Sequence, residues 1–537
     1  MSIFSDYKKF PRVNLQEPDE LSFSSLSLGK SLRVKRCESN PRNVFGRNYR
    51  FSANNNERPK GRFFNENREL HIPKRNECTE ISENRKSYIQ ENFSDSCDIP
   101  ANKIISSYKF INESELANSW ETSGLVPILC KNIQIAAYKR PREIQKRVIP
   151  LMLKGLNLQV STRTGSGKTV SYIIPIIHQV SEIKSKSGHG ETPQSPFAII
   201  IVPTMELALQ VSDRIVKLTT GLNVSCSRVV GGYSFNYNKA EICQGCDIVV
   251  GTLGRLGKMM TQSHIRLTSL RYFVIDECDH FVIDDRSQEL SNIMEFMRSS
   301  YPNLDIQISV FMSVSSPDIS SFLEKYTGRD FAKIVEPRVI QYSQVNFVYN
   351  PNIIHKMYFV KERKEKPEKL LELIRIIRAS DIKKANTSCT RIIIFTDTIL
   401  WCKQITSYIC MMMSDIHCNE FNGNLSSLKR EQYLEEFQKT SSEIQILVST
   451  DLLSRGIDIY SLNHVINYDL PEHFESFHHR IGRVGRINKG YAYTLIDESD
   501  SYDCTQVPNI INLLDNVGQL DEPIQRKLDY MYKSINP

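Results

Sequence analysis

Short apolar runs alternate with amphipathic segments along the chain from about Trp120 onwards. Runs of four to eight mostly apolar residues are typical of strands buried on both faces, and amphipathic segments are typical of the helices that cover them. This alternation predicts an α/β fold in which helices cover both faces of a parallel sheet. In the first half we expect strands within 156–162, 197–204, 246–252, 272–278 and 307–314, and a helix at 205–220.

The pattern pauses between about Glu336 and Pro351 and then starts again, with apolar runs at 391–397, 445–450, 464–470 and 491–497. We therefore expect two successive α/β domains. The first would span 109–340 and the second 356–520, joined by a linker at 341–355 and followed by a short tail at 521–537. A run of methionines closes the helix expected at 401–413, and we interpret it as core filling.

Residues 1–108 are rich in Ser, Asn, Arg and Glu and show no sustained apolar period. Such a segment cannot bury enough surface to offset its chain entropy, so we expect a disordered arm. Between Lys30 and Lys86 there are 15 Lys and Arg against 7 Asp and Glu, an excess of +8, while the whole chain carries +7. A basic arm with interleaved aromatic residues is suited to bind nucleic acid. A solvated tail and a docking tail for protein partners are the alternatives.

Thirteen cysteines are scattered along the chain without a framework spacing. The CxxC pair of Cys243 and Cys246 has no second pair at a zinc-like distance, so reduced thiols of an intracellular protein are the preferred interpretation. The first ten residues lack the apolar core of a secretory signal, and no run of about 18 apolar residues occurs. We expect a protein of the cytoplasm, with the nucleus as an alternative, that is not secreted and has no membrane partner.

The strongest motif is TRTGSGKT at 162–169, between an expected strand and an expected helix. Gly165 and Gly167 allow the backbone to approach phosphate oxygens, and the N–H groups at the start of the helix face the anion. Lys168 would reach the β and γ phosphates of a nucleotide, and the Thr169 hydroxyl would bind Mg²⁺. The generic phosphate-binding pattern has Gly where this chain has Thr162, but the GSGKT core is intact.

A second motif, VIDECD, places Asp276 and Glu277 at the carboxyl end of an expected strand. Ligands bind at this end of the strands in open α/β sheets. Asp276 can hold Mg²⁺, and Glu277 can position or activate water for attack on a γ phosphate. The alternative is an acidic cap that begins a helix.

A third motif, HHRIGRVGR, lies in the second expected domain and contains His479, Arg480, Arg483 and Arg486. Arg483 and Arg486 are three positions apart and share one face if this run is helical. Arginines supplied across a cleft neutralise the charge that develops during phosphoryl transfer. The alternative is the solvated basic face of a helix.

In this order and in two units, the three motifs resemble those of the DEAD-box helicases of superfamily two. The arm, with its Arg, Gly and aromatic residues, loosely resembles those of germline relatives such as Vasa. The resemblance runs from about Trp120 to about Asp500. Trp120, followed 25 positions later by Gln145, resembles the adenine-reading Q motif. Further similar segments are PTMELALQ (203–210), Gly231-Gly232, TLGRL (252–256), SVS (313–315), IFTDT (394–398), Gly423, Arg430 and STDLLSRGID (449–458).

The resemblance implies two tandem RecA-like domains that close around ATP, Mg²⁺ and RNA. ATP hydrolysis would drive local unwinding or remodelling of RNA and RNA–protein complexes, with RNA held mainly by its backbone. The implied catalytic residues are Lys168, Thr169, Asp276, Glu277, Arg483 and Arg486, with Thr169 and Asp276 on the metal. Implied cofactor contacts are Trp120, Tyr138, Gln145, Thr164, Gly165, Ser166, Gly167, Lys168, Thr169 and Asp458. Implied RNA contacts are Pro203, Thr204, Gly232, Thr252, Arg255, Gly423, Arg430 and Thr450, and implied coupling residues are Ser313, Ser315, His479 and Arg480.

Several positions depart from the residues usual in this family, but none of them removes a group expected to touch phosphate. These are Arg142 within PREIQ where Pro-Thr-Pro is usual, Met205 for Arg, Leu253 for Pro, Cys278 for Ala and Ser427 for Gln. Two other functions stay open: an RNA clamp that has lost turnover, and a DNA-directed motor on the same framework. An ATPase assay with and without RNA tests the first, and competition between RNA and DNA tests the second.

Overall fold

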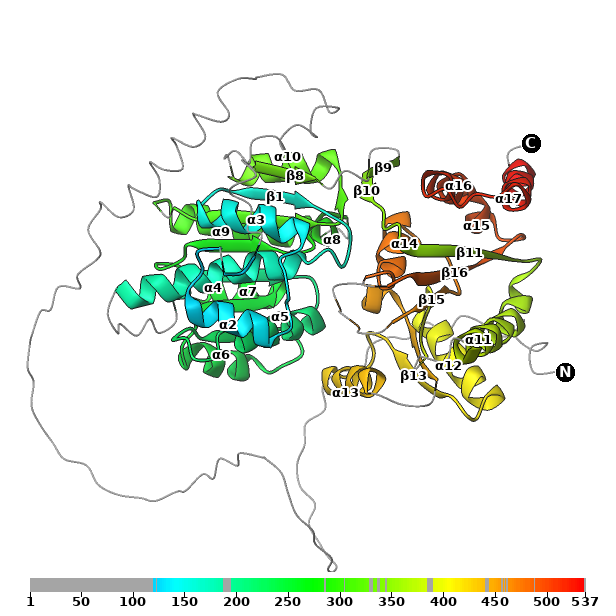
Figure 1. The fold of residues 1–537 in the computed structure, drawn as a ribbon, viewed down its shortest axis with the longest axis horizontal. Coiled ribbons are helices and arrows are strands. Elements are labelled where there is room, and N and C mark those ends of the chain that lie inside the picture. Colours follow the sequence, from blue (N-terminus) through cyan, green and yellow to red (C-terminus); the bar gives the residue numbers. More distant parts are fainter. Residues whose placement is uncertain are drawn as a thin grey trace, which may run out of the picture. The chain divides into compact units, whose positions relative to one another are not determined.

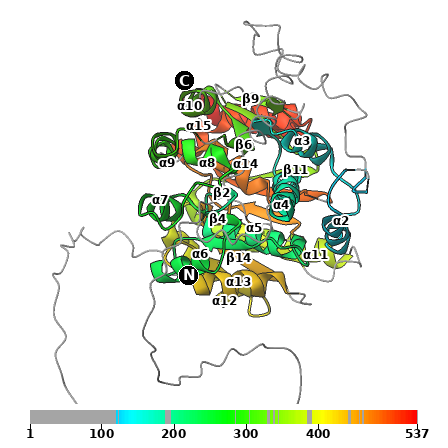
Figure 2. The same ribbon diagram turned by 90° about the vertical axis from the view of Figure 1, so that its left-hand side faces the viewer.

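The computed structural model describes residues 119–121, 123–186, 195–283, 286–303, 305–327, 332–335, 339–342, 345–383, 390–439, 444–454, 457, 459, 462–486 and 488–535. The basic arm expected at 1–108 lies outside these residues. Within the described ranges, no helix combines the length and the apolar character that a membrane span requires. Figures 1 and 2 show the arrangement of the elements from two directions.

The first lobe contains a sheet in which every paired strand is parallel, with the order β3-β4-β2-β5-β6-β1-β8. All five strands expected from the first-half apolar runs are present. The strands are β1 (Leu158–Ser161), β2 (Ala198–Val202), β3 (Cys226–Val229), β4 (Ile248–Thr252), β5 (Tyr272–Ile275), β6 (Gln307–Met312) and β8 (Ala332–Val335).

Alternate residues of these strands enter two separate apolar cores, one on each face of the sheet. Ile200 and Val202 of β2 belong to one core, and Ile199 and Ile201 belong to the other. The first core is closed by α2 (Pro127–Ile135), α3 (Glu143–Leu153), α4 (Lys168–Lys186) and α5 (Met205–Leu218). The second is closed by α6 (Phe235–Cys243), α7 (Leu253–Thr261), α8 (Cys278–Ile283), α9 (Ser287–Ser300) and α10 (Pro317–Thr327). Figure 2 shows α7, α8 and α9 on one side of the strands and α2, α3 and α4 on the other.

The second lobe repeats this plan with a parallel sheet of order β11-β16-β15-β12-β14-β13. The strands are β11 (Ile353–Val360), β12 (Arg391–Phe395), β13 (His417–Phe421), β14 (Gln445–Ser449), β15 (His464–Asn467) and β16 (Gly490–Asp497). One core lies under α11 (Lys366–Lys383) and α12 (Ile399–Met412). The other lies under α13 (Ser427–Gln438), α14 (Phe474–Ile481), α15 (Ser501–Thr505), α16 (Val507–Asn516) and α17 (Glu522–Ile535). Short 3₁₀ turns are η3 (Arg363–Glu365) and η4 (Asp451–Ser454). The predicted fold of two helix-covered parallel sheets is confirmed.

A small antiparallel sheet of order β7-β10-β9 combines one strand from within the first lobe with two strands that follow β8 in the chain. Its strands are β7 (Val314–Ser315), β9 (Val339–Tyr342) and β10 (Val345–Val348). The range expected as a linker, 341–355, therefore includes β10 and the start of β11. The range expected as a tail, 521–537, includes α17, whose Leu528 and Met531 are buried in the second lobe.

The methionine run at the end of α12 is mostly exposed. Met411 and Met412 are 66% and 49% exposed, and only Met413 is buried. The buried stripe of α12 consists of Cys402, Ile405 and Ile409, spaced by three and four residues. Met411 and Met412 lie off that stripe, so the interpretation of the run as core filling is wrong for these two residues.

Candidate functional site

The motif residues follow the carboxyl ends of the parallel strands in both lobes. In the first sheet, the loop 162–169 follows β1, the DECD segment follows β5 and Ser313 follows β6, and these three strands are neighbours. The segments expected to grip RNA follow β2, β3 and β4, which are neighbours at the other end of the same sheet. Strand order alone therefore separates a candidate nucleotide site from a candidate RNA site.

The phosphate loop, residues 162–169, is already folded around a lysine. Gly165 and Gly167 have φ angles of 72° and 106°, a region that glycine adopts without steric cost. The Lys168 Nζ atom donates to the carbonyl oxygens of Thr162 (2.7 Å) and Arg163 (3.2 Å). The side-chain oxygens of Thr162 and Ser166 are 2.8 Å apart. The loop thus holds an ammonium group where backbone N–H groups at the start of α4 can meet an anion.

Asp276 and Glu277 form the acidic part of the site. Asp276 is buried and accepts hydrogen bonds from the Tyr172 hydroxyl (2.8 Å) and the Glu277 N–H (3.0 Å). Burial and the neighbouring Glu277 charge raise the pKa of Asp276 to about 6. A cation bound here would offset that cost, and the carboxylate with the Thr169 hydroxyl supplies the hard oxygen ligands that Mg²⁺ prefers. Glu277 has a φ of 52°, rare outside glycine and typical of functional sites.

A polar network leads from the phosphate loop to the second lobe. Lys168 donates to the Ser313 Oγ atom (2.8 Å), and the Ser313 and Val314 N–H groups donate to Asp279 (both 3.0 Å). The same Asp279 oxygen is 3.4 Å from the Nε2 atom of His479 in α14. Burial acts to raise the pKa of Asp279, but the hydrogen bond and charge of His479 hold it well below its usual range. Two of the residues predicted to couple the lobes, Ser313 and His479, meet in this network.

The other two predicted coupling residues lie elsewhere. Ser315 is in β7, where it pairs with Asn346 of β10. Arg480 is fully buried in the second lobe, where it forms an ion pair with Asp451 and donates to the Asp469 carbonyl oxygen (2.7 Å). Arg480 therefore ties together the loops of its own lobe.

The two arginines expected to reach phosphate follow α14 and are not part of it. The helix ends at Ile481, and Gly485 has a φ of 74°, so the condition under which both arginines would share one helix face is not met. They converge for another reason. Arg483 and Arg486 both donate to the Ile457 carbonyl oxygen, at 2.6 and 3.3 Å.

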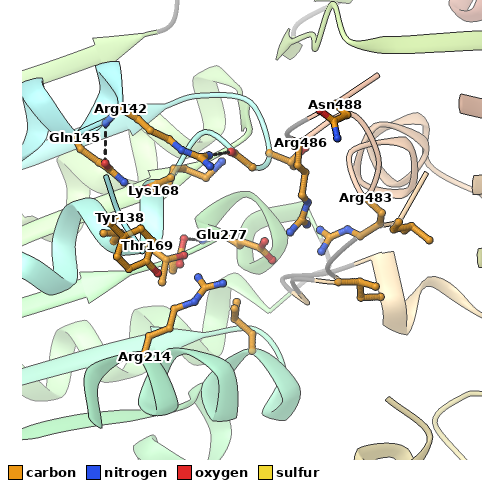
Figure 3. Close-up of a pocket in the computed structure, with 18 of the residues that line it drawn as sticks. Tyr138, Arg142, Gln145, Lys168, Thr169, Arg214, Glu277, Arg483, Arg486 and Asn488 are labelled. Atoms are coloured by element: carbon orange, nitrogen blue, oxygen red, sulfur yellow. Dashed lines mark hydrogen bonds between the residues drawn. The ribbon is translucent and has the colours of Figure 1, made fainter. Parts of the chain in front are cut away.

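Groups from both lobes line one cavity of about 270 Å³. The Thr164 hydroxyl donates to the Gly482 carbonyl oxygen (3.0 Å), and Arg163 donates to the Asn350 side chain (3.1 Å), so the phosphate loop is in contact with the second lobe. Figure 3 shows Arg483 and Arg486 facing the side of the cavity that carries Glu277. The lining residues are Tyr138, Arg142, Gln145, Thr164, Gly165, Gly167, Lys168, Thr169, Val170, Leu207, Arg214, Asp276, Glu277, Ile459, Leu462, Asn463, Arg483, Arg486 and Asn488.

The residues expected to read adenine divide into two groups. Tyr138 and Gln145 line the cavity, whereas Trp120 is buried behind it and donates from its indole nitrogen to the Tyr138 carbonyl oxygen (2.6 Å). Gln145 accepts from the Arg142 N–H (2.8 Å) and donates to the Gly167 carbonyl oxygen (3.3 Å). A side-chain amide has two N–H groups and two acceptor lone pairs. Among the described residues, these two bonds use one acceptor and one donor of Gln145, which leaves one of each for a ligand.

Eight lining residues were not among the predicted site residues, and four of them, Arg142, Arg214, Asn463 and Asn488, are polar. Arg142 donates to the Gly165 carbonyl oxygen (2.6 Å), and Figure 3 shows it beside Gln145 at the phosphate loop. Arg214 projects from α5 seven residues after Leu207, which also lines the cavity, but it belongs to no motif that marked it in the sequence. For Asn463 and Asn488 the sequence offers no signal either.

The residues expected to contact RNA lie at loops and helix starts. The Thr204 hydroxyl, after Pro203, accepts from the Leu207 N–H at the start of α5 (3.3 Å). The Thr252 hydroxyl accepts from the Gly231 N–H (3.2 Å), and Arg255 lies over the Phe235 ring, 5.8 Å from its centroid. Gly232, Gly423 and Thr450 follow β3, β13 and β14. Asp458, expected at the nucleotide, lies outside the described residues.

An ion pair joins the two candidate RNA-binding segments. The Nε atom of Arg430 in α13 is 3.0 Å from a carboxylate oxygen of Glu206 in α5, and both side chains are largely buried. The lobes thus meet at the candidate RNA surface as well as at the cavity.

Two family models match the chain. The DEAD/DEAH box helicase model matches residues 142–320, and the model of the helicase conserved C-terminal domain matches residues 365–488. Together the two matches cover more than half of the chain and one match falls in each lobe.

Similar curated proteins carry names from one functional class. The chain is 27% identical over 430 residues to the ATP-dependent RNA helicase glh-1 of Caenorhabditis elegans, covering 76% of this chain and 54% of that protein. It is 30% identical over 426 residues to the ATP-dependent RNA helicase ddx46 of Dictyostelium discoideum, and the match covers 77% of this chain and 33% of that protein. It is 28% identical over 431 residues to a probable ATP-dependent RNA helicase, vasa-like, of Penaeus vannamei, covering 80% and 57%. The chain therefore spans between a third and three fifths of these relatives.

Solved structures confirm the fold. Dbp5 of S. cerevisiae bound to RNA and ADP BeF3 superposes with a TM-score of 0.61 at 23% identity, covering 78% of this chain and 99% of that one. Mss116p bound to ssRNA and AMP-PNP superposes with a TM-score of 0.64 at 19% identity, and the match covers 78% of this chain and 83% of that chain. At these identities the likeness shows the fold alone.

Proposed function

The chain belongs to the DEAD/DEAH box helicase family, and from that premise we propose that it is an ATP-dependent RNA helicase. It hydrolyses ATP when RNA is bound, and it uses the cycle of closing and opening to unwind short duplexes or remodel RNA–protein complexes.

The observation that carries this proposal is the cavity shared by the two lobes. A lysine in a glycine loop and two carboxylates come from the first lobe, and Arg483 and Arg486 come from the second. This is the set of charges that phosphoryl transfer requires, and no single lobe supplies it. Turnover therefore depends on closure of the lobes, which ligands that prefer the closed state would drive.

Each group at the cavity has a proposed task. Lys168 and the N–H groups of residues 164–167 bind the β and γ phosphates. Glu277 orients the attacking water, and Arg483 and Arg486 stabilise the charge that develops on the γ phosphate. Thr169 and Asp276 would hold Mg²⁺, which when bound neutralises phosphate charge.

The adenine end of the cavity is formed by Tyr138 and Gln145, with Trp120 supporting Tyr138 from behind. Asp458 is proposed to complete the nucleotide site from the second lobe. Ser313 and His479, joined through Asp279, report the state of the phosphate loop to the second lobe.

RNA is proposed to lie across both lobes at the loops and helix starts that carry Pro203, Thr204, Gly232, Thr252, Arg255, Gly423, Arg430 and Thr450. Backbone N–H groups and hydroxyls at these positions suit phosphates and 2′-hydroxyls, so binding is largely independent of base sequence. The ion pair between Arg430 and Glu206 would hold the two halves of this surface together.

We also propose an intracellular setting, in the cytoplasm or the nucleus. The nine cysteines within the described ranges are all free thiols, which fits a reducing compartment. The basic arm at 1–108 would add RNA affinity, with protein docking as its alternative role.

The test is steady-state ATP hydrolysis by the full chain with no nucleic acid, with single-stranded RNA and with DNA of the same sequence. The proposal predicts low activity alone and strong stimulation by RNA in preference to DNA. Tight ATP and RNA binding without turnover would instead identify a clamp, and equal stimulation by DNA would identify a DNA-directed motor.

A further inference from the structure

His280 lies between Glu277 and the second lobe. It belongs to α8, is 5% exposed, and its Nε2 atom is 3.7 Å from the Glu277 Oε2 atom. On its other side, its ring packs against the ring of His479 in α14, with centroids 4.2 Å apart and planes tilted by 39°. His280 therefore touches both a group at the reaction site and a residue of the opposite lobe. It is not part of any motif matched in the sequence.

The Glu277 side chain needs such a neighbour. Its Oε2 atom is buried and accepts no hydrogen bond from the residues that the structure describes. A buried carboxylate oxygen without a donor loses its hydration without replacement, and no hydrogen bond fixes its orientation. The left-handed backbone at Glu277 fixes where the side chain starts but not where its carboxylate points. The His280 Nε2 atom, 3.7 Å from Oε2, is close enough to donate after a small movement.

The charged groups around His280 hold it in this place. Glu277, just before α8, and Asp279, within α8, precede it in the chain, and His479 faces it from α14. Asp279 in turn binds His479 and the Ser313 N–H, which is connected to Lys168. The imidazole is thus at the end of the polar network that joins the phosphate loop to the second lobe.

We propose that His280 is a positioning residue that orients the Glu277 carboxylate when the second lobe closes. The inference rests on the proposed function, because Glu277 orients the attacking water only in an ATPase. With the lobes together, the His479 ring blocks one direction in which the imidazole could swing, so its N–H stays directed at Glu277. With the lobes apart, this support is lost and the carboxylate is no longer aligned. Closure would therefore align the Glu277 carboxylate and also bring Arg483 and Arg486 to the cavity.

The test compares three variants of the full chain. His280→Phe keeps a ring against His479 but has no N–H, and His280→Gln keeps an N–H donor but has no ring. The matched control is His478→Phe. Burial lowers the pKa of His478 to about 3, so it is neutral, and its ring packs against Phe347 (5.2 Å) at the same junction without touching Glu277. Each variant is assayed for ATPase rate at saturating ATP and RNA, for the half-maximal concentrations, and for the lifetime of the RNA complex in ATP.

His280→Phe should lower the saturated rate on the order of 10- to 100-fold, the scale of a misplaced reacting group. The half-maximal ATP and RNA concentrations should stay near wild type, and the RNA complex should live longer because closure still occurs. His280→Gln should recover part of the rate, and His478→Phe should behave like wild type. A shorter-lived complex, or equal losses in His280→Phe and His478→Phe, would show that His280 only packs the junction. Wild-type protein without RNA-stimulated hydrolysis would overturn both proposals, whereas an active wild type with an unaffected His280→Phe would overturn this one alone.

Discussion

Met205 of the first lobe and Ser427 of the second lobe meet at Gly232. A Cβ atom built on Gly232 would be 3.1 Å from the Met205 Sδ atom and would overlap the Ser427 Oγ atom. These are two positions at which the sequence departs from the residues usual in the family, Arg and Gln. The two departures therefore lie in the same place, beside the candidate RNA surface. There Met205 and Ser427 together are smaller and less polar than the usual Arg and Gln.

This packing predicts the effect of Gly232→Ala. The added methyl group would collide with Ser427, and the φ of 94° at Gly232 disfavours any side chain. We expect the closed arrangement to be destabilised, which lowers RNA-stimulated ATPase activity on the order of 10-fold for about 1.4 kcal/mol. ATP binding in the absence of RNA should change little, and fluorescent nucleotide titration measures it.

Gly231→Ala is the matched control, because a Cβ atom at Gly231 would meet nothing within 4 Å. Combining Gly232→Ala with Ser427→Gly should return part of the lost activity. Equal effects of the two alanine variants would contradict this account of the junction.

The adenine end of the cavity predicts a preference for ATP over GTP. The free N–H and lone pair of Gln145 match an adenine edge, and a mismatched base would leave buried polar groups unpaired at a cost of about 1–3 kcal/mol. Competition of GTP against ATP in the RNA-stimulated assay measures this preference, which Gln145→Ala should weaken. Equal use of both nucleotides by the wild type would refute the assignment.

The raised pKa of Asp397 predicts that the stability of the second lobe depends on pH. Burial and the charge of Asp469, 3.3 Å from the Asp397 N–H, raise the pKa of Asp397 from 3.8 to about 6. A raised carboxyl pKa means that the folded state holds the proton more tightly than the unfolded state. The cost of ionising Asp397 is thus absent below about pH 4 and complete above about pH 6.

Asp397→Asn should therefore raise the melting temperature at pH 8 and leave it unchanged near pH 4. The side chain is 40% exposed, so the gain should stay below about 1 kcal/mol, or about 2–4 °C. Asp415→Asn is the control in the same lobe, since the hydrogen bond from Arg378 lowers the pKa of Asp415. That variant should not gain stability at pH 8. A gain of equal size at both pH values for Asp397→Asn would rule out the electrostatic explanation.

The basic arm predicts a separable contribution to RNA binding. Its excess of +8 between Lys30 and Lys86 should attract RNA by counterion release, a term that is independent of sequence and sensitive to salt. Deleting residues 1–108 should raise the RNA concentration for half-maximal ATPase activity and flatten its salt dependence. The rate at saturating RNA should be nearly unchanged, because the arm supplies no motif residue. An unaltered affinity and salt slope would favour the protein-docking alternative.

The buried strands could be predicted from the sequence because their apolar runs are continuous. β2 is five apolar residues, and it was expected from that run alone. β3 (CSRV) and β13 (HCNEF) at the two sheet edges were not expected, because an edge strand has fewer neighbours to bury it and can be polar.

At the site, local motifs indicated the groups of the phosphate loop and the DECD segment, but not groups that arrive through tertiary packing. Arg214 reaches the cavity from the middle of α5, and the convergence of Arg483 and Arg486 depends on the Ile457 carbonyl oxygen of a distant loop. Trp120 matches a motif, yet it supports Tyr138 and does not line the cavity. Such outcomes depend on which residues become neighbours after folding, and sequence spacing does not contain that information.

The central claim is that Glu277 orients the water that hydrolyses ATP, and that this happens only when both lobes have closed around ATP and RNA. The most direct measurement is the dissociation rate of labelled single-stranded RNA from wild-type protein and Glu277→Gln in the presence of ATP. Because Asp276 and Lys168 remain, the variant should still bind ATP and close. The account predicts that wild type releases RNA as ATP is consumed, whereas Glu277→Gln has no measurable turnover and retains RNA far longer. Wild-type turnover in Glu277→Gln, or equally rapid release of RNA from both proteins, would contradict it.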